Sequence, residues 1–278
     1  MIYICADDYG LCEKVSQNIK KCLDEGALNK VSVFPNFDMV GLNELTGDKN
    51  KVSLHLNFVE GKCMADSHKL LADKDGNFKN TFTGLLKLSL LKGKAFEEEV
   101  YREIKAQVLY WKKILPEGAE FLIDSHQHTH IIPGIFKILL RVIEEENINV
   151  SYLRIPVELI SPYIKEPSLY FTYSLINIVK VGLINFLWLF NKKKLKKYPL
   201  PTAYFCGVFL SGKMDERVNK ILPHYINKAR KENKDLEILF HPGFCLECDL
   251  SGENIVFKDF YTSKNRKKEF NTVMKLTI

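Results

Sequence analysis

The chain has 278 residues, 46% of them hydrophobic, which is enough to bury the core of one large α/β domain or two small ones. Its formal net charge of +6 is mildly basic, and much of the excess comes from a lysine cluster at 192–197. Because neither zinc-finger spacing nor an RNA-binding aromatic signature accompanies this charge, we expect no nucleic-acid partner.

Short apolar runs alternate with helix-like patterns along the chain, which is typical of a parallel α/β architecture. The runs predict seven strands, at 2–6, 31–35, 52–58, 121–127, 151–156, 203–209 and 236–241. Apolar residues at helical spacing predict helices at 13–25, 96–115, 135–146 and 215–233. Pro223 is expected to bend or break the last helix.

Two segments stand apart from this alternation, and we expect one domain, 1–278, that carries both. Residues 60–94 have no matching strand and contain a turn at Asp75-Gly76, which is typical of a lid or substrate-binding loop. Residues 169–197 form an apolar helical insertion that ends in the lysine cluster. This insertion is either buried, as a core helix or a lid over a substrate groove, or it lies on an anionic membrane surface.

The cysteines indicate a reducing compartment. There are seven, an odd number, and Met1 leads directly into an apolar strand rather than a secretory signal. We therefore expect free thiols and a cytoplasmic location, peripheral to the membrane if the insertion binds it. Cys245 and Cys248 form one CxxC pair, which without a second pair is weak evidence for zinc or redox chemistry.

Near the middle of the chain, residues 123–134 read IDSHQHTHIIPG. A strand points every second side chain to the same face, so Asp124, His126, His128 and His130 would look one way if the strand continued. Histidines so placed serve as metal ligands, proton carriers or a polar strand end. We expect Asp124, His128 and His130 to bind substrate or line the rim of a site, with a role behind the metal ligands as the alternative for Asp124.

Polar residues also occur at the ends of the other predicted strands. Asp7 and Asp8 end the first strand, and His55 lies near the end of the third. In a β/α barrel these strand ends meet at one mouth. A carboxylate and two imidazoles form a hydrolytic metal set with open positions for water and substrate. Asp8, His55 and His126 would supply it, since an N-cap role explains one aspartate but not both.

Hydrolysis of an amide also needs a group that takes a proton from water and one that protonates the leaving amine. Asp7 is the expected base, and Arg154, at the end of the fifth strand, would keep it ionised through a charge-assisted pair. His241, in FHPGF, is the candidate acid because imidazole titrates near neutrality. A histidine before Pro-Gly is also found as a plain turn residue.

These residues carry a resemblance to a known family. The stretches ADDYGLCEKVSQNI, SLHLNFVEG, IDSHQHTHIIP, LRIPVE, FCGVFLSGKM and EILFHPG occur in the order and spacing of the YdjC-like carbohydrate deacetylases. The resemblance runs from Ile2 to about Cys248 and implies a distorted seven-stranded β/α barrel, similar to that of the polysaccharide deacetylases. It implies metal-dependent removal of N-acetyl groups from an amino sugar, in an N-acetylglucosamine-containing oligosaccharide or glycolipid.

The resemblance also implies roles for individual residues. The metal ligands fall on Asp8, His55 and His126, the base on Asp7, and the acid and base-orienting groups on His241 and Arg154. Some relatives act on lipid-linked sugars, which implies that the apolar insertion brings the barrel mouth to a membrane-borne glycolipid. The family suggests magnesium as the divalent ion, whereas two imidazoles and one carboxylate favour zinc or another transition ion.

Two other functions remain open at this point. One is a metal-dependent phosphoesterase, since carboxylate and histidine sets also serve phosphate esters. The other is a non-catalytic sugar- or lipid-binding protein on the same barrel. The sequence leaves a homo-oligomer open as well.

Overall fold

The computed structural model of the chain describes residues 1–37, 45, 50–66, 68–251 and 254–278. The described part contains seven strands, all in one parallel sheet of order β5-β4-β3-β2-β1-β7-β6. The strands are β1 (Ile2–Tyr9), β2 (Lys30–Val33), β3 (Lys51–Leu56), β4 (Phe121–Ser125), β5 (Val150–Leu153), β6 (Tyr204–Cys206) and β7 (Leu236–Phe240). The predicted number of strands is confirmed, and their boundaries shift by a few residues.

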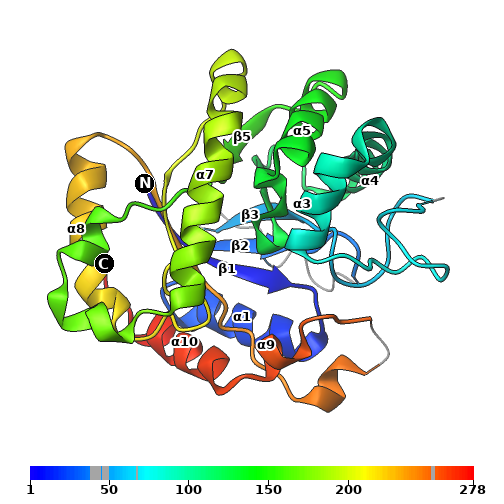
Figure 1. The fold of residues 1–278 in the computed structure, drawn as a ribbon. Helices are drawn as coiled ribbons and strands as arrows, with labels where there is room; N and C mark the ends of the chain where they lie inside the picture. Colours follow the sequence, from blue (N-terminus) through cyan, green and yellow to red (C-terminus); the bar gives the residue numbers. More distant parts are fainter. Residues whose placement is uncertain (38–44, 46–49, 67, 252–253) are drawn as a thin grey trace.

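The sheet curls into a half-barrel, with helices packed around it (Figure 1). Within the described residues, the edge strands β5 and β6 do not pair directly with each other, and each contacts only the segment next to the other strand. Leu153 donates to the carbonyl of Pro201 over 3.0 Å, and Glu158 forms a single parallel bridge with Phe205. The fold is therefore a distorted seven-stranded β/α barrel, as expected, with an incomplete seam between β5 and β6.

The helices follow the apolar spacing of the sequence. Val15, Ile19, Cys22 and Leu23 form the buried stripe of the first one, which has the predicted bounds. The helices are α1 (Glu13–Glu25), α3 (Phe82–Leu91), α4 (Gly93–Ile114), α5 (Pro133–Glu145), α6 (Ser161–Ile164), α7 (Leu175–Lys197), α8 (Val218–Lys231), α9 (Lys258–Thr262) and α10 (Lys264–Lys275). Three 3₁₀ segments accompany them: η1 (His126–Ile131), η2 (Pro167–Thr172) and η3 (Glu247–Leu250).

The structure differs in part from two expectations about local structure: the last predicted helix is not broken at Pro223, and a helix forms within residues 60–94. Helix α8 continues past Pro223, which lies in its second turn, where the missing N–H removes one main-chain bond near the helix start. Residues 60–94 are not a loop throughout, because α3 forms within them and Thr81 caps it by accepting from the N–H of Gly84. The part before α3 is an irregular segment with two isolated antiparallel bridges.

Candidate active site

The end of β1 is irregular, and this irregularity brings Asp7 and Asp8 to the same cavity. The pairing of β1 with β2 shifts register between Ala6 and Tyr9. Asp8 has a φ of 75° and Gly10 one of 97°. Aspartate is among the few residues other than glycine that tolerate positive φ. Regular alternation stops here, so both carboxylates line the cavity instead of pointing to opposite faces of the sheet.

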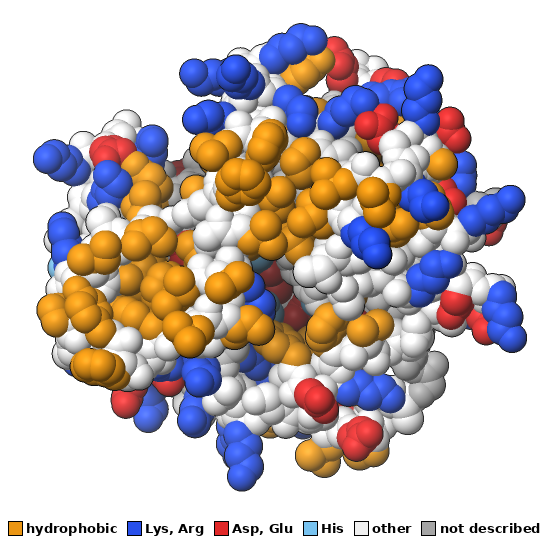
Figure 2. All heavy atoms as spheres, in the orientation of Figure 1, with side chains coloured by type: hydrophobic (Ala, Val, Ile, Leu, Met, Phe, Trp, Pro, Cys, Tyr) orange, Lys and Arg blue, Asp and Glu red, His pale blue; other side chains and the backbone are white. Residues whose placement is uncertain are grey.

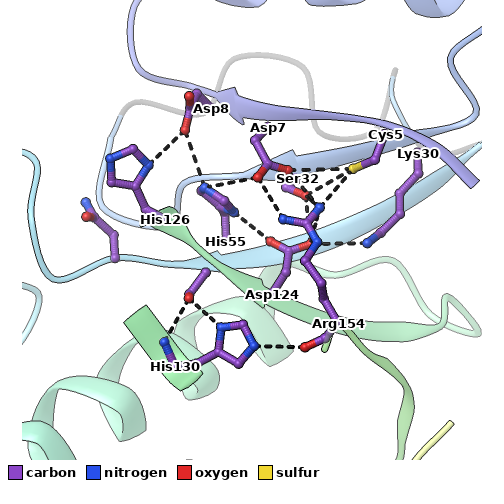
Figure 3. Close-up of polar contacts among 12 residues, drawn as sticks. Cys5, Asp7, Asp8, Lys30, Ser32, His55, Asp124, His126, His130 and Arg154 are labelled. Atoms are coloured by element: carbon purple, nitrogen blue, oxygen red, sulfur yellow. Dashed lines mark hydrogen bonds and ion pairs between the residues drawn. The ribbon is translucent and has the colours of Figure 1, made fainter. Parts of the chain in front are cut away.

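Asp8 lies against two histidines from neighbouring strand ends (Figure 3). Its Oδ1 atom is 3.4 Å from Nε2 of His55, on β3, and 3.0 Å from Nδ1 of His126, which directly follows β4. Ligand-type atoms of the three residues all lie within 4.8 Å of one another, and all three residues are buried. The structure therefore brings together the three residues that the sequence nominated as metal ligands.

The cluster also has unused hydrogen-bonding capacity. Within the described ranges, Asp8 Oδ2, His55 Nε2 and His126 Nε2 have no hydrogen-bond partner although they are shielded from solvent. Buried polar atoms are normally paired, so one unpaired atom on each of three neighbouring side chains needs an explanation. A carboxylate and two imidazoles are a suitable donor set for a divalent ion, and the residues present therefore fit a metal.

The pKa values of the cluster also indicate a site that favours positive charge. Burial lowers the pKa of His55, but the carboxylates of Asp7, Asp124 and Asp8 outweigh it and raise the pKa to about 10. Burial raises the pKa of Asp8, while His126 and His55 hold it well below its ordinary value. The site is thus a buried group of carboxylates that stabilises positive charge at the position of His55.

Asp124 supports the cluster from behind. Its Oδ1 atom is 2.6 Å from Nδ1 of His55, and its Oδ2 atom accepts from Ser32 over 2.7 Å and from Lys30 over 3.2 Å. The residue is fully buried and is not part of the cavity lining. The prediction that Asp124 binds substrate is therefore wrong, because its carboxylate is used inside the barrel. Its contact with Nδ1 leaves Nε2 of His55 directed toward Asp8.

Arg154, immediately after β5, holds Asp7. Its Nη1 and Nη2 atoms donate to the two oxygens of Asp7 over 2.7 and 2.8 Å, and Nη2 also donates to Glu237 over 2.6 Å. Burial raises the pKa of Asp7, but Arg154 and then His55 overcome this and lower it to about 2. Asp7 is therefore ionised at every physiological pH and is fixed in orientation by a two-pronged contact.

The histidine stretch does not continue as a strand. β4 ends at Ser125, and Gln127 and His128 adopt left-handed φ values of 52° and 57° within η1. His126, His128 and His130 therefore do not share one strand face. His128 lines the cavity, and its prediction as a substrate-binding residue stays open.

The prediction that His130 binds substrate is wrong. Its Nε2 atom is 2.8 Å from the carbonyl oxygen of Arg154, and its Nδ1 atom is 2.5 Å from Oγ of Ser125. Both ring nitrogens are thus occupied by protein, and the residue is fully buried away from the cavity lining. His130 cannot bind substrate in this arrangement, and it instead fastens η1 to the end of β5.

His241 follows β7 and faces the same cavity. Its main-chain N–H donates to Glu269 over 2.7 Å, while its Nδ1 atom has no hydrogen-bond partner in the described chain. Burial lowers the pKa of its imidazole, and the nearby Asp8 and Glu269 offset this only in part. The pKa of His241 is therefore below that of a free imidazole.

The cavity has a volume of 550 Å³. The carboxylates of Asp7 and Asp8 lie at one side of it, and much of the rest is apolar. Residues from α3, α7 and α9 and from the segments after β6 and β7 contribute Thr81, Phe82, Thr83, Ile176, Val179, Lys180, Leu183, Ile184, Gly207, Val208, Ser211, Phe257, Phe260 and Tyr261.

The sequence interpretation missed two polar residues near the cluster. Tyr261, on α9, lines the cavity with a buried hydroxyl that has no partner among the residues described. Glu60 is fully buried, and its Oε1 atom lies 3.9 Å from Nε2 of His126. Glu60 stands in the stretch SLHLNFVEG, close to His55, and this position was its only signal. Tyr261 belongs to a C-terminal helix for which no element was predicted.

Comparison with known proteins extends this result. A sequence model described as YdjC-like protein matches residues 1–277. The chain belongs to the YdjC-like family. A similar protein from Danio rerio, named carbohydrate deacetylase, is 28% identical over 165 residues, which are 56% of this chain and 50% of that protein. A second, from Thermoanaerobacter pseudethanolicus, is 24% identical over 233 residues and 80% of each chain.

The chain spans about half the length of several of the curated relatives it matches. For the carbohydrate deacetylase of Brevibacillus brevis, the match is 27% identical and covers 54% of this chain and 58% of the relative. A crystal structure of a protein from Enterococcus faecalis V583, described as a cellobiose-phosphate cleavage protein, superposes with a TM-score of 0.63. It is 19% identical and covers 98% of this chain and 90% of its own, so it supports the fold.

Proposed function

We propose that this protein is a metal-dependent hydrolase that removes the N-acetyl group from an amino sugar, such as an N-acetylglucosamine-containing oligosaccharide or glycolipid. One observation carries the proposal. Buried Asp8, His55 and His126 bring ligand atoms within 4.8 Å of one another, and the ionised carboxylate of Asp7 lines the same cavity as Asp8 and His126. The deacetylase names of the YdjC-like relatives supply the reaction class.

The ion would be held by Asp8, His55 and His126. A divalent ion at this position would supply Lewis acidity, which polarises an acetamide carbonyl and lowers the pKa of water. Zinc or another transition ion suits two imidazoles and one carboxylate, and the family resemblance favours magnesium. The choice of ion is part of the test below.

Asp7 acts as the base of the reaction. Arg154 keeps its carboxylate ionised and fixes both oxygens, so Asp7 is always ready to accept a proton from the attacking water. The low pKa makes Asp7 a weak base, which suits a water molecule whose own pKa is depressed. Arg154 is thus a positioning residue that acts through Asp7.

His241 is the candidate acid for the departing amine. Its imidazole lines the cavity, and burial keeps the pKa of the ring below its ordinary value. It would receive the proton that Asp7 has taken from the water and donate it to the nitrogen as the C–N bond breaks. We also propose a cytoplasmic location for the protein. Its seven cysteines are free thiols, which is the state expected in a reducing compartment.

The decisive experiment measures acetate release from N-acetylglucosamine and its short oligosaccharides. The protein is stripped with a chelator and reloaded with magnesium, zinc, or no metal, and mass spectrometry follows loss of an acetyl group. Acetate release that returns only with metal supports the proposal. If phosphate esters are cleaved and acetamides are not, the phosphoesterase alternative replaces it.

A further inference from the structure

Helix α7 presents an apolar surface that no part of the described chain covers. Its most apolar window has a mean hydropathy of 1.3, and only 28% of that window is buried. Together with η2, it leaves the following side chains more than half exposed: Phe171, Leu175, Ile176, Val179, Phe186, Leu189 and Phe190. Figure 2 shows hydrophobic side chains gathered around a hollow in which acidic side chains are visible. Monomeric soluble proteins rarely expose a contiguous apolar patch of this kind.

The opposite side of α7 is firmly attached to the barrel. Asn177 donates to the carbonyl of Ser211 over 2.8 Å, Asn185 to that of Glu158 over 3.0 Å, and Asn191 to that of Ile131 over 2.7 Å. Val181, Ile184 and Leu187 are buried beneath the helix. A helix held along its length in this way is part of the barrel wall, so it does not leave the domain to cross a bilayer.

The exposed face of α7 is continuous with the wall of the active-site cavity. Ile176 and Val179 are more than half exposed and also line the cavity, together with Leu183 and Ile184. Sugar hydroxyls need polar partners, and this wall offers none apart from Lys180. An aliphatic chain linked to the sugar would match it and could pass from the cavity onto the exposed face.

The charges of α7 indicate which kind of surface its apolar face would bind. The helix contains no aspartate or glutamate, and Lys192, Lys193, Lys196 and Lys197 are exposed at its C-terminal end. Lysines next to an apolar surface bind anionic lipid headgroups, while the apolar side chains enter the boundary with the acyl chains. A second copy of the chain could cover the apolar face, but the lysine clusters of two copies would then repel each other if they met.

We infer that α7 docks the protein on an anionic membrane surface and that its cavity side receives the aliphatic part of a lipid-linked amino sugar. The substrate class rests on the proposed deacetylase function, whereas docking does not. The side chains assigned to docking are those of Phe186, Leu189, Phe190 and the four exposed lysines, and none of them lines the cavity.

Flotation with vesicles tests docking without any enzymatic assay. We expect the full chain to float with vesicles of equal parts phosphatidylcholine and phosphatidylglycerol, and much less with phosphatidylcholine alone. Changing Lys192, Lys193, Lys196 and Lys197 to Gln should weaken binding at least about tenfold. The matched control changes four exposed lysines of α10, Lys264, Lys267, Lys268 and Lys275, to Gln and should leave binding intact.

A second pair of variants tests the apolar face. Phe186→Ser with Phe190→Ser should reduce binding to anionic vesicles, whereas Leu90→Ser with Leu91→Ser removes even more exposed apolar side chains from α3 and should not. Failure of the wild-type chain to float would overturn docking. Docking would also be overturned if light scattering showed a dimer that Phe186→Ser with Phe190→Ser dissociates, and no vesicle binding was detected.

The substrate class is tested by comparing an alkyl glycoside of N-acetylglucosamine with the free sugar. We expect a lower KM for the alkyl compound at similar kcat, and loss of that advantage in Val179→Ser. Equal KM values for both compounds would overturn the lipid-linked substrate and leave the deacetylase intact. Vesicle binding without acetate release from any compound would instead overturn the proposed function and leave docking intact.

Discussion

The Nδ1 atom of His55 lies 2.6 Å from a carboxylate oxygen of Asp124, fully inside the barrel. This contact fixes which ring nitrogen of His55 faces Asp8. A supporting carboxylate of this kind typically raises metal affinity by about 10- to 100-fold. We therefore expect Asp124→Asn to weaken zinc or magnesium binding by about that factor, as measured by competition with a chelator.

The control for that change is Ser32→Ala. Ser32 donates to the other oxygen of Asp124 over 2.7 Å and does not touch His55, so its removal disturbs the same interior without freeing the imidazole. If metal affinity is equal in the wild type and in Asp124→Asn, then metal binding by His55 does not depend on its contact with Asp124.

Asp7→Asn should separate metal binding from turnover. Asparagine keeps the shape of the side chain but cannot take a proton from water, so acetate release should fall by about 10²- to 10⁴-fold. Because Asp7 is not among the three nominated ligands, metal content measured by atomic spectroscopy should be unchanged. Full activity in this variant would exclude Asp7 as the base.

Glu158 should make stability depend on pH. Burial raises its pKa from 4.5 to about 7, although the hydroxyl of Tyr163 and main-chain N–H groups of Gly207 and Phe209 act in the other direction. Between these pH values the folded protein holds a proton that the unfolded chain has lost. The stabilisation from Glu158 is therefore complete below pH 4.5 and falls by about 3 kcal/mol as the pH rises through 7.

Urea unfolding at a series of pH values measures this effect against Glu158→Gln. The variant cannot titrate at this position, so the free energy of unfolding of the wild type should fall relative to that of the variant, by about 3 kcal/mol, as the pH rises from 4.5 to 7. Comparing the two proteins cancels the contributions of other titrating groups. A difference that is constant with pH would contradict the prediction.

Tyr261→Phe tests the residue that lines the cavity with an unpaired hydroxyl. Removing it breaks no hydrogen bond within the described chain, so stability should change by less than about 1 kcal/mol. If the hydroxyl binds the sugar, kcat/KM should fall by about tenfold, the loss of one hydrogen bond. Unchanged kcat/KM for every sugar tested would remove Tyr261 from the site.

The sequence allowed a correct prediction of which residues at the strand ends lie close together. Parallel strands in one barrel have their carboxyl ends on the same side, so Asp8, His55 and His126 could be grouped although they are far apart in sequence. The break after Ser125 could not be predicted. It depends on left-handed backbone at Gln127 and His128, which are ordinary residues for a strand, and it turns His130 away from the cavity.

The roles of Asp124 and Tyr261 were harder to predict for different reasons. Alternation suggested that Asp124 faces the same way as His126, but its partner is His55 on the adjacent strand, and strand register is not readable from one chain. Tyr261 reaches the cavity from a short C-terminal helix whose packing depends on long-range contacts. Periodicity alone carries no information about such placement.

The incomplete seam between β5 and β6 lies away from the ligand cluster and next to helix α7. The ligand cluster belongs to the continuous run from β1 to β4, whereas α7 packs on the side of the seam, where Asn185 bonds to Glu158. Substitutions of the α7 side chains that line the cavity away from the cluster, such as Ile176 and Val179, can therefore alter what is recognised without changing the contacts of Asp8. Such a division would let related chains diversify their substrates by changing one helix while the reaction stays the same.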